Sequence, residues 1–329
     1  MTETFMPYKV STLKSLRETF IDRLSRRLFF ALMKDFKTGK LTLIEKNQSY
    51  RIGQSSKGVS LEATIYVHHP RFYTSTVFGG SIGSAEAYMA GLWSTSHLTN
   101  VIRLVILNQQ IMEKMDKGWS WLSDTVHKLH HHFRHNTLKG SKENIVAHYD
   151  LGNDFYKLFL DETLTYSCGI FDHENCTLEA ASIAKYDRIC RKLQLHPDDH
   201  VIEIGGGWGG YSIHAAKHYG CRVTTTTISD EQYALAEKRI AASGLSHRIQ
   251  LLRRDYRRLV GKFDKLVSIE MVEAVGHQYL DTFFHICSRL LKANGIMLLQ
   301  AITIIDQVFD AHKRSVDFIK RYIFLGSCI

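Results

Sequence analysis

A run of glycines follows a short apolar segment in the second half of the chain and has the form of a nucleotide-binding loop. The segment reads Val201-Ile-Glu-Ile-Gly-Gly-Gly-Trp-Gly209, with glycines at 205, 207 and 209 before a predicted helix. Glycine lets the backbone approach a ligand closely and turn sharply into the next helix. Because Gly210 is also present, the spacing fits a dinucleotide site as well. The loop therefore predicts a nucleotide-type cofactor and leaves its identity open.

Two neighbouring features favour S-adenosylmethionine over a dinucleotide. Glu203 precedes the loop on the same predicted strand, where a methyltransferase uses an acid near the amino-acid part of its cofactor. The next strand ends in Thr224-Thr-Thr-Thr-Ile-Ser229 without the acid that a dinucleotide site places there. Ser229 and Gln232 also have the spacing of a capping box for the helix that follows, and we expect them to serve both purposes.

Alternating helices and strands must position this loop. The pattern predicts helices at about 178–194, 209–219, 230–243 and 279–292, and strands at 200–204, 222–227, 249–253, 265–271 and 296–303. Such alternation is typical of a parallel sheet that helices cover on both faces. The fold class is therefore α/β, with a Rossmann-like sheet.

The first part of the chain differs in pattern. A basic amphipathic helix is predicted at about 11–34, with an apolar stripe, which suits either a membrane interface or docking on the protein surface. Strands are predicted at 41–45, 50–52 and 59–67, and a helix at 84–108. We expect a small α+β domain over 1–110, a linker over 111–145 and a second domain over 146–329. Five histidines between 127 and 135 lack a carboxylate or cysteine at ligand spacing, so we expect no metal site there.

Charge separates the two parts. The net charge is +9, and residues 1–140 hold 19 Lys and Arg against 10 Asp and Glu, whereas residues 141–329 hold 23 of each. A basic part predicts a polyanionic partner, either nucleic acid or an anionic membrane surface. The six cysteines form no CxxC pair, which favours a reduced compartment. With no signal peptide or spanning segment in view, we expect a cytoplasmic protein, peripheral to the inner face of the membrane.

Several motifs together resemble the cyclopropane-fatty-acyl-phospholipid synthase family. They are His148-Tyr-Asp-Leu-Gly-Asn-Asp154, Tyr166-Ser-Cys168, the glycine loop and Glu270-Met-Val-Glu-Ala-Val-Gly276. Ser84-Ala-Glu-Ala-Tyr-Met-Ala-Gly-Leu-Trp93 is similar to the family's N-terminal domain. The resemblance implies a class I methyltransferase sheet preceded by a small lipid-associated α+β domain. It also implies that unsaturated phospholipid acyl chains at an anionic membrane surface are the partner. Nucleic acid is not expected, because the basic domain lacks a recognisable recognition motif.

The resemblance assigns roles to particular residues. It implies that the cofactor contacts Tyr166, Ser167, Val201, Glu203, Gly205, Gly207, Trp208, Gly209, Thr227, Ile228, Ser229, Gln232, Arg254 and Asp255. It further implies that methyl transfer to a cis alkene leaves a carbocation, whose proton passes to a bound bicarbonate ion. The implied bicarbonate ligands are the backbone of Cys168 and of Ile302 together with Glu273, with His148 nearby. Gln300 is a further implied catalytic residue. An apolar site rich in aromatic faces such as Tyr149, Phe155 and Tyr166 suits such a cation.

Two departures from the family pattern bear on activity. Gln300 stands where many members have a histidine, so that a hydrogen bond to bicarbonate must differ. The family continues beyond the end of this sequence, so the sheet is expected to lack its last strands. The apolar strand 296–305 would then be an edge that favours self-association, including a homo-oligomer. Alternatives that stay open are a sibling enzyme making methyl-branched or methylene fatty acids, a small-molecule methyltransferase, and a relic that binds cofactor or membrane without turnover.

Overall fold

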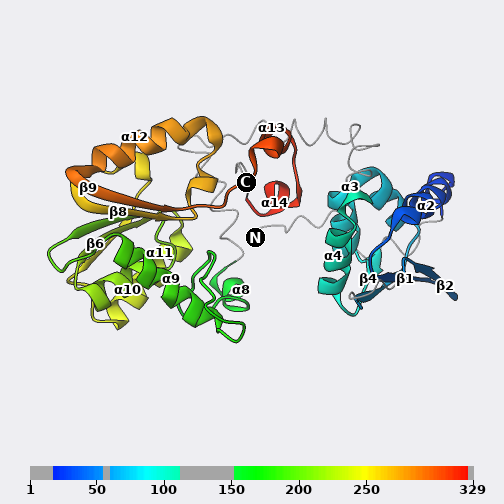
Figure 1. Ribbon diagram of the computed structural model, residues 1–329, viewed down its shortest axis with the longest axis horizontal. Coiled ribbons are helices and arrows are strands. Elements are labelled where there is room, and N and C mark those ends of the chain that lie inside the picture. The colour runs from blue at the N-terminus through cyan, green and yellow to red at the C-terminus, as the bar shows by residue number, and fades with distance from the viewer. Residues whose placement is uncertain (1–17, 55–59, 112–151, 325–329) are drawn as a thin grey trace. The chain divides into compact units, whose positions relative to one another are not determined.

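The computed structural model describes residues 18–54, 60–111 and 152–324 (Figure 1). The chain divides into two compact units, Met1–His130 with Val316–Phe318, and His131–Ser315 with Ile319–Ile329. The predicted linker over 111–145, with its histidines, lies outside the described residues apart from Ile111. Among the described helices, none combines the length and the apolar character that crossing a bilayer requires.

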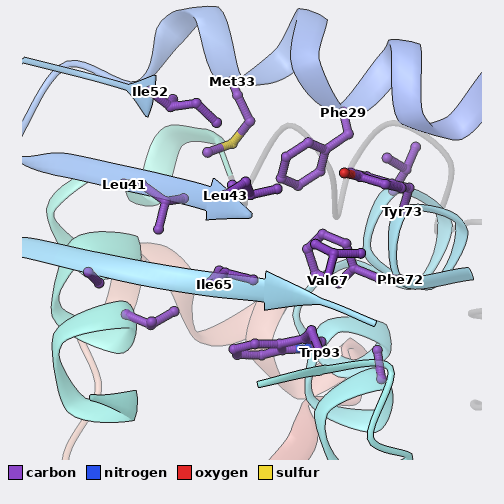
Figure 2. Packing of buried hydrophobic residues seen from close by; sticks show 14 of the residues in the cluster. Phe29, Met33, Leu41, Leu43, Ile52, Ile65, Val67, Phe72, Tyr73 and Trp93 are labelled. Carbon is purple, nitrogen blue, oxygen red and sulfur yellow. The ribbon is translucent and has the colours of Figure 1, made fainter. Parts of the chain in front are cut away.

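The first unit is built on a mixed sheet in the order β2-β1-β3-β4. β1 (Lys40–Glu45) pairs antiparallel with β2 (Gln48–Ile52) and parallel with β3 (Glu62–Val67), which pairs antiparallel with β4 (Trp93–Ser94). Side chains alternate between the faces of a strand, so each strand turns every second residue toward the core. Figure 2 shows the resulting cluster, in which the labelled strand residues are Leu41, Leu43, Ile52, Ile65, Val67 and Trp93.

Helix α2 (Phe20–Leu32) packs against this unit through a partly polar face. Thr19 is its N-cap and forms a capping box with Asp22. The buried side chains of Asp22 and Ser25 both accept the hydroxyl of Thr74, at 2.6 and 3.3 Å, so their polar atoms are satisfied. Because α2 begins after Thr19, the prediction of one continuous helix over 11–34 is wrong at this point; residues 1–17 lie outside the description.

The prediction of a single helix over 84–108 is also wrong. The chain forms α3 (Arg71–Met89), then β4, then α4 (Leu98–Leu107). Gly91 follows α3 with φ of 70°, a left-handed conformation that commonly ends a helix and that glycine adopts without steric cost. The backbone then turns so that Trp93 lies opposite Val67.

The second unit contains a five-stranded sheet in the order β7-β6-β5-β8-β9, with every pairing parallel. The strands are β5 (His200–Ile204), β6 (Arg222–Thr227), β7 (Ile249–Arg253), β8 (Phe263–Ile269) and β9 (Leu291–Gln300). Helices α9 (Leu178–Lys192), α10 (Gly210–Tyr219) and α11 (Asp230–Ala242) cover one face and α12 (Leu280–Leu290) the other (Figure 1). The predicted Rossmann-like sheet is therefore confirmed. The strand order reverses between β5 and β8, and ligands of such folds bind at the carboxyl ends of strands at that point.

The C-terminal elements depart from the sequence prediction. β9 ends at Gln300 and not at 303 or 305, because its partner β8 stops at Ile269, opposite Gln300. After β9 the chain forms two short helices, α13 (Asp306–Arg314) and α14 (Phe318–Tyr322). In the described part of the sheet, β9 is an edge strand, as expected.

Candidate active site

The loop after β5 has the geometry that its glycines predict. Gly205, Gly207 and Gly209 have φ of 86, 54 and 83°, all in the left-handed region. Gly209 is the N-cap of α10. The N–H of Gly206 donates to the carbonyl of Thr226 at 2.9 Å, which fixes the loop against β6. The loop backbone is thus fixed at the carboxyl end of β5, where a ligand can approach it closely.

Glu203 is buried beneath this loop. Its Oε2 accepts the hydroxyls of Ser212 and Thr225, the latter at 2.7 Å. Burial raises the pKa of Glu203, and these two hydrogen bonds act in the opposite direction. The acid that the sequence singled out is therefore held by hydroxyls from α10 and β6.

The end of β6 supplies a polar corner beside the loop. Ser229 is the N-cap of α11, and its hydroxyl accepts the N–H of Gln232 at 3.3 Å. The side chain of Gln232 accepts the Thr227 hydroxyl at 2.8 Å and does not reach back to the N-cap. The N–H of Ser229 instead donates to the Thr227 hydroxyl at 3.2 Å. Only half of the predicted capping box forms, and Gln232 faces the pocket.

A pocket lies over the carboxyl ends of β5, β6 and β8. Three residues that the resemblance assigned to the cofactor are not part of its walls. Val201 is fully buried in the core, and Gly209 and Ser229 are helix N-caps. The other assigned residues line it, namely Tyr166, Ser167, Glu203, Gly205, Gly207, Trp208, Thr227, Ile228, Gln232, Arg254 and Asp255.

Arg257, which sequence reasoning missed, orients one wall of this pocket. Its guanidinium makes two hydrogen bonds to the Asp255 carboxylate, at 2.8 and 2.6 Å, in a largely buried pair. Those bonds raise the pKa of Arg257. A bidentate pair of this kind fixes a carboxylate in one orientation. Asp255 is therefore presented to the pocket in a defined position.

A second cluster adjoins the pocket and joins three distant segments. The backbone N–H of Cys168 donates to Glu270 Oε1 at 2.9 Å. The Gln300 amide donates to the same oxygen at 2.6 Å and to the Cys168 carbonyl at 3.3 Å. Cys168 and Gln300 were expected here, whereas Glu270 was not assigned a role. Its acidic side chain at the end of a buried strand was the available signal.

Glu273 forms the neighbouring contact. Its Oε1 accepts the N–H of Ile302 at 2.6 Å, and its side chain is buried. Burial raises the pKa of Glu273, the hydrogen bond from Ile302 opposes this, and the charge of Glu270 adds to it. The structure thus brings Glu273 and Ile302 together, and they are hydrogen-bonded to each other, whereas the resemblance implied that both hold bicarbonate. His148 and Tyr149 lie outside the described residues.

Lys185 on α9 is a buried cation that sequence reasoning missed. Its ammonium donates to the hydroxyl of Ser167. Burial lowers its pKa to about 8, while the nearby charge of Glu270 acts in the other direction. Its spacing of four residues from both Ala181 and Ile189, which are buried on the same helix, was a signal of its burial.

Trp208 connects the loop to a further segment. Its indole N–H donates to Asn153 Oδ1 at 2.7 Å, at the start of α8 (Asn153–Lys157). Arg239 donates to the carbonyl of Trp208 and to that of Glu162, both at 2.9 Å. The loop is therefore joined to the segment around α8 both directly, through Asn153, and through Arg239.

A parallel sheet of this order, with a glycine loop and a buried acid at the end of its first strand, is the arrangement of class I S-adenosylmethionine-dependent methyltransferases. The family model for mycolic acid cyclopropane synthetase matches residues 136–329. The chain belongs to this family.

Curated relatives agree with this assignment. The tuberculostearic acid methyltransferase UfaA1 of Mycobacterium tuberculosis is 34% identical over 274 residues, which cover 81% of this chain and 64% of that protein. The cyclopropane-fatty-acyl-phospholipid synthase of Escherichia coli K12 is 36% identical over 290 residues, covering 82% and 68%. The chain thus spans about two thirds of the length of these relatives.

Solved structures show the same fold. The mycolic acid cyclopropane synthase CmaA1, complexed with SAH and CTAB, is 35% identical and covers 56% of this chain and 68% of its own, with a TM-score of 0.52. The cyclopropane synthase MmaA2 of Mycobacterium tuberculosis is 34% identical with the same coverage and TM-score. These likenesses support S-adenosylmethionine as the cofactor of the pocket.

Proposed function

We propose that the chain transfers a methyl group from S-adenosylmethionine to a cis double bond of an unsaturated phospholipid acyl chain, and that loss of a proton gives a cyclopropane. The observation that carries this proposal is the position of Glu270, which lines the cofactor pocket and also joins the Cys168 and Gln300 cluster. A carboxylate beside a methyl-donor pocket can serve an alkene substrate, whose reaction ends in proton loss. The names of the family and of the E. coli relative support the same class.

Aromatic rings give this pocket the surroundings that a carbocation needs. S-adenosylmethionine supplies an electrophilic methyl group, and an alkene is a weak nucleophile. The rings of Tyr166 and Phe324 stack with centroids 6.2 Å apart, and Tyr156 meets Tyr166 edge-on at 5.3 Å. Ring faces attract positive charge, and a site closed to water strengthens that attraction. These residues would exclude water and stabilise the cation.

The described residues do not fit bicarbonate as the proton acceptor in the way that the resemblance implies. The N–H of Cys168 donates to Glu270 and the N–H of Ile302 donates to Glu273. A further anion would have to displace these carboxylates or lie beside them against charge repulsion. No step is therefore assigned to bicarbonate.

A different fate of the same cation is the second candidate. The 34% identity to a tuberculostearic acid methyltransferase favours weighing a methyl-branched or methylene product alongside the cyclopropane. A hydride shift before proton loss would give the methylene compound. Identification of the lipid product separates these outcomes.

The test is product analysis with labelled cofactor. Purified chain is incubated with S-adenosylmethionine carrying a trideuterated methyl group and with vesicles of cis-unsaturated phosphatidylglycerol. We expect fatty acids that retain two of the three deuterium atoms, with a cyclopropane ring identified by mass spectrometry and NMR. Vesicles with saturated chains serve as the control and should yield no product. Label in protein, in head groups or in no lipid at all would contradict the proposed function.

We further propose that the first unit binds an anionic membrane surface. On α2, the apolar side chains of Phe20 and Leu24 are 73% and 43% exposed, and Arg23 and Arg27 are exposed beside them. Exposed apolar side chains flanked by cations suit the interface of an anionic bilayer. The charge excess of residues 1–140 supports the same partner.

Co-sedimentation with phosphatidylglycerol vesicles tests this membrane proposal. We expect binding that weakens as salt rises, since the Debye length is about 8 Å at physiological ionic strength. The double variant Phe20→Ser/Leu24→Ser should bind at least about tenfold more weakly, because each apolar side chain contributes up to about 2 kcal/mol when it is fully buried and about 1.4 kcal/mol corresponds to a factor of ten. Ile183→Ser removes an apolar side chain from α9 that is 41% exposed, close to the value for Leu24, and is the matched control. Equal binding by the wild type and the double variant would refute the assignment to α2.

A further inference from the structure

Glu270 occupies a conformation that acidic side chains seldom adopt. It follows β8 directly and has φ of 45°, in the left-handed region that favours glycine. Its N–H donates to the carbonyl of Gln300 at 2.9 Å, which extends the pairing of β8 with β9 by one step. Strained backbone of this kind persists where the surrounding structure requires it, and it is concentrated at active sites.

The strained backbone directs the carboxylate into a ready-made set of donors. Glu270 Oε1 accepts the N–H of Cys168 at 2.9 Å and the amide of Gln300 at 2.6 Å. Gln300 is itself oriented by the Cys168 carbonyl, at 3.3 Å. These donors belong to segments 102 and 30 residues away in sequence. The position is therefore an anion site, and the chain's own carboxylate fills it.

The second oxygen of this carboxylate is available for chemistry. Within the described residues, Glu270 Oε2 makes no hydrogen bond, and Glu270 lines the cofactor pocket. Lys185 lies near enough for the two charges to attract.

We propose that the Glu270 carboxylate, and not a bound bicarbonate ion, is the base of the reaction. This inference rests on the proposed function. After methyl transfer, the cation lies on the carbon next to the methylated one. A C–H bond of the transferred methyl breaks, its electron pair forms the ring-closing C–C bond, and the proton passes to Glu270 Oε2. Glu270 then releases that proton to water, and Gln300 and Cys168 hold the carboxylate in place throughout.

Two substitutions separate this role from a structural one. Glu270→Gln keeps the size of the side chain and an oxygen for the Cys168 N–H, but cannot accept the proton. Glu270→Gly removes the side chain, leaves the anion site open and suits the positive φ, so its melting temperature should not fall. Glu179→Gln, an exposed acid on the first turn of α9, is the matched control. All variants are made in the full chain, and calorimetry checks that each binds S-adenosylmethionine as the wild type does.

The first measurement needs no turnover. Binding of ¹³C-labelled bicarbonate is followed by NMR, and we expect none with the wild type and clear binding with Glu270→Gly. Bicarbonate binding by the wild type would overturn the inference even if no lipid product were ever found. Absence of any lipid product would refute the proposed function alone, so the two failures are distinct.

The second measurement is turnover in buffer freed of bicarbonate. The wild type should keep its rate, and Glu270→Gln should lose on the order of 10²-fold or more, the usual contribution of a general base. Glu270→Gly should be equally slow and should regain rate when bicarbonate is added, because the small anion can then occupy the site. A wild type that needs added bicarbonate, or a Glu270→Gln variant with the wild-type rate, would overturn the assignment of the base.

Discussion

Replacement of Gly205 by valine is expected to lower the affinity for S-adenosylmethionine about 100-fold or more. Gly205 has φ of +86°, and a Cβ added there would lie 2.7 and 2.9 Å from Cγ and Cβ of Met271. If the loop shifts to relieve this overlap and the unfavourable φ, returning it to the conformation that binds the cofactor costs about 1–3 kcal/mol for each, and about 1.4 kcal/mol corresponds to a factor of ten in affinity. The extra side chain would also occupy the space where the backbone approaches the cofactor.

Titration calorimetry with S-adenosylmethionine measures this effect directly. Gly244→Val is the matched control, because Gly244 has φ of +71° and a Cβ there would meet nothing within 4 Å. That variant has the same backbone strain at the end of α11 and should bind cofactor normally. If Gly205→Val bound as tightly as the control, the loop after β5 would not be the cofactor site.

The substitution Phe283→Ala is expected to destabilise the chain by about 4 kcal/mol, the usual cost of truncating a fully buried phenylalanine. Phe283 has no exposed surface and packs edge-on against Tyr256, with ring centroids 5.5 Å apart. The alanine would leave a cavity between α12 and the sheet, which the packed surroundings could close only in part.

Chemical denaturation of the full chain gives the change in the free energy of unfolding. The adjacent residue offers a control of equal chemistry, since Phe284 is 46% exposed on the same helix. Phe284→Ala should cost less than about 1 kcal/mol, in line with surface substitutions. A loss of similar size from both variants would show that the core on this face of the sheet is not formed as described.

The sequence predicted best what is periodic or glycine-rich. The first four strands of the second unit, the loop from Gly205 to Gly209 and the N-cap at Ser229 follow from short local patterns, and each lies within a few residues of its predicted position. The fifth strand, β9, begins at Leu291, five residues before its predicted start. The break at Gly91 was missed because a helical pattern on both sides concealed one left-handed residue. The prediction relied on local composition, whereas the strand at Trp93 forms because it pairs with β3, which is distant in sequence.

The candidate active-site residues also divide into those that a local pattern predicts and those that only tertiary contacts bring together. Glu203 could be predicted because its position relative to the glycines is fixed along one strand. Glu270 could not, because its role depends on the pairing of β8 with β9 and on the approach of the segment that holds Cys168. The approach of residues from separate segments is a property of tertiary structure, and no spacing along the chain encodes it. Arg257 was missed for a simpler reason, since an arginine two residues after an acid is usually a solvated surface pair.

The hydrogen bond from the Trp208 indole to Asn153 makes two regions thermodynamically dependent on one another. Any molecule that orders the loop around Trp208 also restrains α8, on which Phe155 is exposed and after which Leu158 is exposed. Linkage is reciprocal, so a molecule that immobilises α8 must in turn favour the ordered loop by the same free energy. Arg239 extends the link to Glu162. Binding of a molecule in the pocket should therefore reduce the mobility of α8. Slower amide hydrogen exchange in α8 would measure this effect.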